Sequence, residues 1–285
     1  MKPRIALSIA LFAVLTASTP LIEHAAPESS GNESLEPPAL SPVPTYTCRR
    51  ATGPIQIDGN LDEASWKRAT EIRLLDNSGS GSPMQPTTTA KLLWNDECLY
   101  VGFVAEDSDI RATMRERDQH LWTEEVVEIF IGQSHFYLEI EVNPLNALFD
   151  GRIDIRGQTG RPKFDVDAIV KVNYDIKHSV AVQGTVENQE DKDKRWTVEM
   201  AIPHSALEGI QPVPPKEGDT WGMNLYRIDR SREGDAVKVS AGAWSPTAGW
   251  FHSPERFGKI VFSSQRRIWH QYVLRCVSVG KKRSL

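Results

Sequence analysis

The feature that most constrains the fold is a succession of short runs rich in β-branched and aromatic residues, with turn residues between them. Residues 136–142 show it best, because apolar and charged side chains alternate there with the two-residue period of a half-buried strand. Runs of this kind occupy residues 55–57, 89–94, 98–104, 126–131, 136–142, 168–172, 180–183, 196–202, 221–226 and 259–262. Helical patterns are confined to short stretches at 61–66, 111–117 and 205–207. The chain is therefore predicted to be all-β, a single antiparallel β-sandwich of jelly-roll or immunoglobulin-like type with few short helices.

The two ends of the chain differ from this body. Lys2 and Arg4 precede an apolar run, residues 5–17, which is short for a membrane span and typical of an export signal. Small residues suited to cleavage follow at 24–26, and an uncleaved membrane anchor is the alternative. We therefore divide the chain into a signal peptide (1–26), a Pro-, Ser- and Glu-rich linker (27–45), the β-sandwich (46–262) and a basic tail (263–285). A secreted protein, periplasmic or extracellular, is expected.

The charge distribution weighs against nucleic acid as a partner. The chain has 33 Lys and Arg against 38 Asp and Glu, and six of the basic residues lie in the tail, so the body is acidic. An acidic body repels phosphate but does not repel a neutral ligand such as a sugar. The tail is interpreted as a poorly packed extension rather than a membrane-binding element, and a monomer is expected.

The chain has three cysteines, Cys48, Cys98 and Cys276. Cys48 and Cys98 lie in or beside strand-like runs and can pair in an oxidising compartment, although the spacing leaves that pairing open. The sequence has no Cys-x-x-Cys motif or His-rich spacing that would indicate a zinc site.

Four motifs follow one another along the predicted sandwich. They are residues 57–66 (IDGNLDEASW), 99–101 (LYV), 118–131 (DQHLWTEEVVEIFI), and the closing pair 244–246 (WSP) and 251–258 (FHSPERFG). In this order and spacing they resemble the family 9 carbohydrate-binding modules, over roughly residues 46–262. The resemblance implies a non-catalytic, sugar-binding β-sandwich that requires no cofactor and can carry structural calcium.

The first motif is interpreted as architectural. Asp58 and Gly59 suit a tight turn, and Trp66 suits a plug at one end of the sandwich. The alternatives are Trp66 as a sugar platform, or calcium held by Asp58, Asp62 and Glu63, whose hard carboxylate oxygens suit that ion. We assign no metal ligands from the sequence.

Trp122 is the first candidate ligand-binding residue. It lies beside Glu124 and Glu125 and just before a strand, so its indole is expected to be partly exposed. An exposed indole can stack on the flat C–H face of a sugar ring and release water. A lone Trp would ordinarily be expected to pack on the core, but the resemblance implies one wall of an aromatic sandwich that holds the sugar.

The resemblance implies a second wall at Trp250. This residue is four positions before Pro254, where three would be expected, so Phe251 or His252 can take the role instead. Trp244 is interpreted as a core residue.

Polar partners of the sugar are expected at Glu128, Glu141 and Asn143. Glu128 is six residues after Trp122, and carboxylates make charge-assisted hydrogen bonds to hydroxyl groups. The resemblance implies Arg and Asn on the strand that follows, so Asn143 fits while Glu141 replaces a base with an acid. The alternative is that Glu139, Glu141 and Asn143 share the solvated face of a half-exposed sheet.

These observations predict a secreted carbohydrate-binding protein that stacks a sugar between two aromatic side chains and serves polysaccharide recognition or carbohydrate catabolism. Its partner would be an oligosaccharide or polysaccharide. The first alternative is a glycoside hydrolase with an acidic cluster, drawn from Glu124, Glu125, Glu128, Glu139 and Glu141. The second alternative is a haem-binding sandwich, which would need an axial His or Met pair. A binding module is expected over an enzyme, because the sequence has no Ser-His-Asp or other nucleophile motif.

Overall fold

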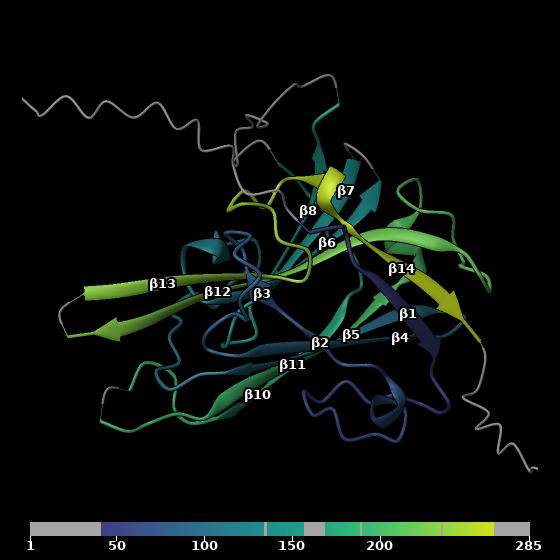
Figure 1. Ribbon diagram of the computed structural model, residues 1–285. Helices are drawn as coiled ribbons and strands as arrows, with labels where there is room; N and C mark the ends of the chain where they lie inside the picture. Colours follow the sequence, from purple (N-terminus) through teal and green to yellow (C-terminus); the bar gives the residue numbers. More distant parts are fainter. Residues whose placement is uncertain (1–40, 134–135, 157–168, 189, 235, 265–285) are drawn as a thin grey trace, which may run out of the picture. The chain divides into compact units, whose positions relative to one another are not determined.

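The computed structural model describes residues 41–133, 136–156, 169–188, 190–234 and 236–264 (Figure 1). The predicted signal peptide, residues 27–40 of the predicted linker and residues 265–285 of the predicted tail lie outside the described residues. Cys276 lies outside them too, while Cys48 and Cys98 are both free thiols.

The described part of the chain is almost entirely strands. These are β1 (Thr45–Arg50), β2 (Ile72–Arg73), β3 (Leu75–Asp76), β4 (Thr88–Trp94), β5 (Cys98–Glu106), β6 (Val126–Gln133), β7 (Phe136–Val142), β8 (Leu148–Asp154), β9 (Val170–Lys171), β10 (Lys177–Gln183), β11 (Arg195–Pro203), β12 (Thr220–Glu233), β13 (Ala236–Ala243) and β14 (Gly258–Ser263). Four short 3-10 helices interrupt them: η1 (Trp66–Arg68), η2 (Leu121–Thr123), η4 (His204–Leu207) and η5 (Pro254–Arg256). Among these residues no helix is both long and apolar enough to cross a membrane. The prediction of an all-β chain with few short helices is confirmed in this coarse form.

The strands form one hydrogen-bonded sheet in the order β10-β11-β5-β4-β1-β14-β12-β6-β7-β8-β9. β13 extends it beside β12, and the short strands β2 and β3 pair with β4 and β13. β1 runs parallel to both of its neighbours, β14 and β4, whereas the other strand pairs of the described residues are antiparallel. The predicted purely antiparallel sandwich is therefore wrong at β1. The fold is a curled mixed sheet, because β1 pairs with distant strands that no hairpin could join to it.

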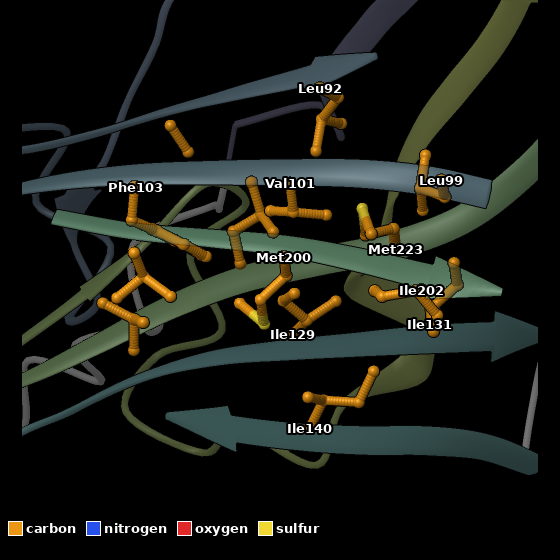
Figure 2. Close-up of a cluster of buried hydrophobic side chains, with 14 of the residues drawn as sticks. Leu92, Leu99, Val101, Phe103, Ile129, Ile131, Ile140, Met200, Ile202 and Met223 are labelled. Atoms are coloured by element: carbon orange, nitrogen blue, oxygen red, sulfur yellow. The ribbon is translucent and has the colours of Figure 1, made fainter. Parts of the chain in front are cut away.

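The main hydrophobic core lies between the two halves of this curled sheet, as Figure 2 shows. Its fully buried side chains come from both halves: Leu92, Val101 and Met200 from β4, β5 and β11, and Ile129, Ile140 and Met223 from β6, β7 and β12. Burial of this apolar surface is the main favourable contribution to folding, at about 25 cal/mol per Å². It also fixes β6, β7 and β12 by one face, which leaves their other face free to present a site.

Several local predictions are wrong. Residues 55–57 do not form a strand, and residues 111–117 do not form a helix. β8 and β13 were not predicted, and β12 continues to Glu233 rather than ending near residue 226. Strand pairing explains the difference, because β13 pairs along the whole distal half of β12 and supplies hydrogen bonds that sequence pattern alone does not reveal.

The first motif has the architectural role predicted for it. Gly59 has φ 90°, and a Cβ there would lie 2.8 Å from the backbone of Ala181, so only glycine fits. Trp66 is fully buried, and its Nε1 donates a hydrogen bond to Glu199 Oε1 at 2.8 Å. The alternative role of Trp66 as an exposed sugar platform is therefore wrong.

Candidate functional site

β6 and β7 present two chemically different faces. The face toward the core carries the apolar side chains of alternate residues such as Ile129 and Ile140. The opposite face carries Glu128 on β6 with Glu139 and Glu141 on β7, and these three are at most 5% exposed. The alternative prediction of a solvated polar face is therefore wrong, because aromatic rings and loops cover this side of the sheet.

A pocket of about 340 Å³ opens onto this second face. Its walls are aromatic or apolar except at two carboxylates and an imidazole, and it is lined by Trp122, Glu128, Phe130, Glu139, Ile169, Ile228, Gly249, Trp250, Phe251 and His252. Such a mixture, in which a few polar groups stand among apolar walls, is typical of small-ligand sites.

Trp122 lies on η2, the short helix that enters β6, and is only partly buried. Its ring stacks on His120 with centroids 4.5 Å apart and meets Phe149 edge-on at 5.4 Å. These two contacts fix the orientation of the indole at the pocket wall. The geometry needed for stacking, a partly exposed and rigidly held aromatic ring, is present.

Trp250, Phe251 and His252 lie in the loop between β13 and η5 and all line the pocket. Phe251 stacks on Tyr226 of β12 with centroids 4.3 Å apart, so it is anchored to the sheet. Trp250 is partly exposed and lies near His252, at 5.6 Å between ring centroids. Trp250 and its neighbours therefore form a wall of the same pocket as Trp122.

His252 contributes a neutral imidazole to the pocket. Its Nδ1 and the hydroxyl of Tyr137 are 2.8 Å apart and share a hydrogen bond. Burial lowers the pKa of His252 to about 3, because the charged form loses its hydration. The ring therefore carries no positive charge at neutral pH.

Glu128, Glu139 and Glu141 form a trio of buried carboxyl groups, with one oxygen of each within 4.8 Å of the others. Glu128 lies directly opposite Glu141 across the β6–β7 pair, and Glu139 is the diagonal neighbour. Glu128 and Glu139 line the pocket, whereas Glu141 lies outside its lining. Desolvation raises the pKa of Glu128 and Glu141 well above the ordinary value, and that of Glu139 to about 7. Glu128 Oε1 and Glu139 Oε2 are buried and accept no hydrogen bond from the described residues.

Asn143 is not part of the pocket lining. Its Nδ2 donates to the carbonyl of Met114 at 2.8 Å, and its Oδ1 accepts from the backbone N–H groups of Leu145 and Ala147. The structure thus brings Trp122, Glu128 and Trp250 together, places Glu141 behind Glu128, and leaves Asn143 holding the turn after β7.

A second buried carboxylate trio, formed by Asp107, Glu125 and Asp229, lies next to the start of β6, on the face opposite to that of Glu128. Here Arg227 of β12 supplies the counter-charge: its Nη2 lies 2.7 Å from Asp107, 2.8 Å from Asp229 and 3.5 Å from Glu125. All four side chains are almost fully buried. One guanidinium thus lies among three carboxyl groups, and burial raises the pKa of Glu125 to about 10, so we interpret this trio as structural.

Two of the three residues suggested for calcium take part in local hydrogen bonds. Asp58 accepts hydrogen bonds from Asn60, and Glu63 accepts one from the backbone of Gln56. Asp58, Asp62 and Glu63 do not belong to either carboxylate group that is close enough to hold an ion in the described part of the chain.

Sequence reasoning gave no sugar-binding assignment to several pocket residues, among them Glu139 and Phe130. Glu139 was considered as one of three polar residues on a strand face and as a member of the acidic cluster of the hydrolase alternative, and Phe130 was placed in a strand without a role. Both follow from the two-residue period, since Phe130 shares the face of Glu128, and Glu139 lies directly opposite Phe130. Their proximity depended on the β6–β7 register, which the sequence did not fix.

The sequence profile of the carbohydrate family 9 binding domain-like proteins matches residues 57–265. This chain belongs to that family. The match spans most of the described sheet, so the resemblance seen in the sequence motifs is confirmed.

The chain is also similar in sequence to two curated proteins. An "Extracellular protein" of Arthroderma benhamiae is 28% identical over 186 residues, which is 62% of this chain and 79% of that protein. Endo-1,4-beta-xylanase A of Thermotoga neapolitana is 23% identical over 209 residues, which is 72% of this chain but only 16% of the xylanase. The second similarity therefore concerns a small part of that enzyme.

One solved structure has a similar fold. A Bacteroides uniformis protein, provisionally described as carbohydrate-binding, superimposes with a TM-score of 0.60. The superposition covers 78% of this chain and all of that chain at 16% identity. At that identity the likeness concerns the fold alone.

Proposed function

We propose that this protein binds an oligosaccharide or polysaccharide in the pocket lined by Trp122, Glu128 and Trp250. One observation carries the proposal. Trp122 and Glu128 belong to one sequence motif, and Trp250 lies more than a hundred positions further along the chain. All three line a single pocket. Membership of the carbohydrate family 9 binding domain-like family supports the same ligand class.

The pocket chemistry suits a sugar. The partly exposed indoles of Trp122 and Trp250 offer flat apolar surfaces for the C–H faces of a pyranose ring. Glu128 would accept hydrogen bonds from sugar hydroxyls, and its buried Oε1 has no other donor among the described residues. In this proposal Glu141 acts through Glu128, and Asn143 positions the turn after β7 rather than touching the sugar.

The test is a glycan array on the full chain, followed by calorimetry on any ligand found, with the variants Trp122→Ala and Trp250→Ala. Losing one stacking surface should weaken binding by about 10- to 100-fold, if a sugar–aromatic stack resembles the 1–3 kcal/mol of other flat ligands. Phe136→Ala is the matched control, since Phe136 is also a partly buried ring but does not line the pocket.

Two outcomes would contradict the proposal. One is the absence of any sugar ligand for the folded protein. The other is an equal loss of affinity in Phe136→Ala and the two Trp variants, which would point to general destabilisation rather than to a binding wall.

The geometry favours binding over hydrolysis. A glycoside hydrolase places two carboxyl groups on opposite sides of the scissile bond. Here Glu128, Glu139 and Glu141 lie side by side on one face of the β6–β7 pair. Glu124 bonds to Thr113 and Met114, and Glu125 lies against Arg227. An assay for release of reducing sugar from any bound glycan tests this alternative directly.

The haem-binding alternative has little support in this site. Met223 is fully buried in the main core, whereas Met114 packs in the separate cluster around Trp122. The two thioethers therefore lie in different clusters and do not form an axial pair. A visible absorption spectrum of the purified protein checks the alternative.

We also propose that the protein is exported. The support is the predicted signal at residues 1–26 and the relative named an extracellular protein. N-terminal sequencing of the protein recovered from the expressing cells' exterior or periplasm should begin close to residue 27.

A further inference from the structure

The two buried carboxylate trios of this molecule differ in one respect. Asp107, Glu125 and Asp229 surround the guanidinium of Arg227. Within the described residues, by contrast, no Lys, Arg or His forms an ion pair with a member of the Glu128 trio. In the first trio a buried guanidinium lies among the three carboxyl groups. In the described residues the second trio has no such cation beside it.

The uncompensated trio is open to the pocket. Glu128 is 1% exposed and Glu139 is 5% exposed, yet both line the pocket wall. Glu128 Oε1 and Glu139 Oε2 are buried without a hydrogen-bond donor in the described structure. A buried acceptor without a donor has lost its hydration and gained no hydrogen bond in return, so a ligand that supplies donors and positive charge would recover that cost.

The remaining pocket residues indicate which kind of cation fits. Apart from Glu128 and Glu139, the lining is aromatic, aliphatic or glycine, with the neutral His252. Calcium takes six to eight oxygen ligands, and this wall offers the carboxylates of two side chains. An organic ammonium group needs few acceptors and is further stabilised over aromatic faces within about 6 Å.

We propose that the sugar bound in this pocket is an amino sugar with a free amine, whose ammonium group lies on Glu128 and Glu139 while its ring packs against Trp122 or Trp250. The inference rests on the proposed function and names its ligand class. Glu141, directly across from Glu128, is a third carboxyl group within reach of the same ammonium group. Desolvation raises the pKa of the three carboxyl groups, and an ammonium group beside them would favour their ionised form.

The test compares glucosamine oligomers with N-acetylglucosamine oligomers of the same length, by calorimetry on the full chain near pH 6.5. The two ligands share ring and linkage and differ at one nitrogen, which is a charged amine in glucosamine and a neutral acetylated amide in N-acetylglucosamine. We expect the glucosamine oligomer to bind at least tenfold more tightly. In Glu139→Gln the ratio of the two affinities should fall by tenfold or more.

Glu233→Gln is the matched control for loss of one negative charge. Glu233 lies at the far end of β12 with its side chain 63% exposed, outside the pocket. The affinity ratio in this variant should equal that of the parent chain. A melting curve for Glu139→Gln establishes that the variant is folded before its affinities are compared.

The possible outcomes distinguish a preference for amino sugars from carbohydrate binding in general. Binding of neutral oligomers with no preference for the amine overturns the amino-sugar inference and leaves carbohydrate binding intact. Absence of binding to any sugar by the folded protein overturns both. Stoichiometric binding of calcium that is lost in Glu139→Gln would identify the trio as a metal site and would also overturn the inference.

Discussion

At the residue scale, the most informative feature is a polar group in an apolar setting. Glu139 is almost fully buried, and desolvation raises its pKa from the ordinary 4.5 to about 7. Between these values the folded state holds a proton that the unfolded state has released. The Glu139 carboxyl therefore lowers stability progressively as pH rises from 4.5 to 7, and the cost persists above pH 7.

Replacing this carboxyl by an amide, which does not titrate, should remove the loss of stability that Glu139 causes as the pH rises. Relative to the parent chain, Glu139→Gln should gain stability between pH 4.5 and pH 8, on the order of 1–3 kcal/mol. The difference would also reflect Glu128 and Glu141, whose carboxyl groups lie within reach, and the neighbouring Tyr226 and His252. Urea unfolding of both chains at pH 5 and pH 8 measures it. A difference that does not change with pH would contradict the buried, raised carboxyl.

The sequence predicted some residues of the pocket correctly and others not. Trp122, Trp250 and Glu128 could be selected because each belongs to a motif with its own spacing. Asn143 belongs to such a motif too, but its amide satisfies backbone groups of the turn instead of facing the pocket. Spacing placed Asn143 at the end of a strand, whereas the structure places it just after β7, where its side chain bonds to the turn that follows.

At the scale of elements, β12 joins the two chemical environments. Tyr226 pairs with Glu128 of β6 and helps to cover the pocket face, while the next residue, Arg227, points to the opposite face and into the Asp107 trio. Because successive side chains of β12 point to opposite faces, this strand lies between the carboxylate trio that surrounds Arg227 and the trio that has no cation beside it in the described residues.

Removing the compensating charge should be costly. Arg227→Met leaves Asp107, Glu125 and Asp229 buried without their partner, so the free energy of unfolding at pH 7 should fall by about 3–5 kcal/mol. The loss should shrink at acidic pH, because the carboxyl groups can then take up protons. Chemical denaturation at the two pH values measures both effects.

The control for that variant is Arg156→Met. Arg156 pairs with Asp154 on the surface, where its side chain is 71% exposed, and such solvent-screened pairs contribute little to stability. Equal stability losses in the two variants would show that burial of the Arg227 cluster does not increase its contribution to the free energy of unfolding.

The prediction of elements succeeded where burial alternates and failed where pairing decides. The run at residues 136–142 coincides with β7, because apolar side chains such as Leu138 and Ile140 face the main core while Glu139 and Glu141 lie on the opposite face. Residues 236–243 carry four exposed positions in succession at their start and gave no such signal, yet they form β13 against β12. Residues 111–115 instead extend toward Glu124 and Glu125, whose carboxylates accept hydrogen bonds from the backbone of Arg111, Thr113 and Met114.

At the scale of the whole molecule, the curled sheet depends on one strand near the start of the described chain. β1 pairs in parallel with β14 from Thr45 to Arg49 and with β4 at Arg49 and Arg50, so it connects the two halves that enclose the core. It also buries Tyr46 and Cys48 in that core. Contacts between residues more than two hundred positions apart leave no local signature, which explains why β1 was not predicted from the sequence.

This arrangement predicts different outcomes for two N-terminal truncations. A chain starting at Pro38 keeps all of β1 and should melt at the same temperature as the full chain. A chain starting at Ala51 loses the hydrogen bonds to β14 and β4 together with the buried side chains of Tyr46 and Cys48, whose loss exposes the core between the two halves. Truncating one large core side chain alone costs about 2–5 kcal/mol, which approaches the 5–15 kcal/mol that holds a typical domain together. The shorter chain should therefore lose its cooperative melting transition and its ligand binding together. A chain starting at Ala51 that still melts cooperatively would show that the two halves of the sheet hold together through their core without β1.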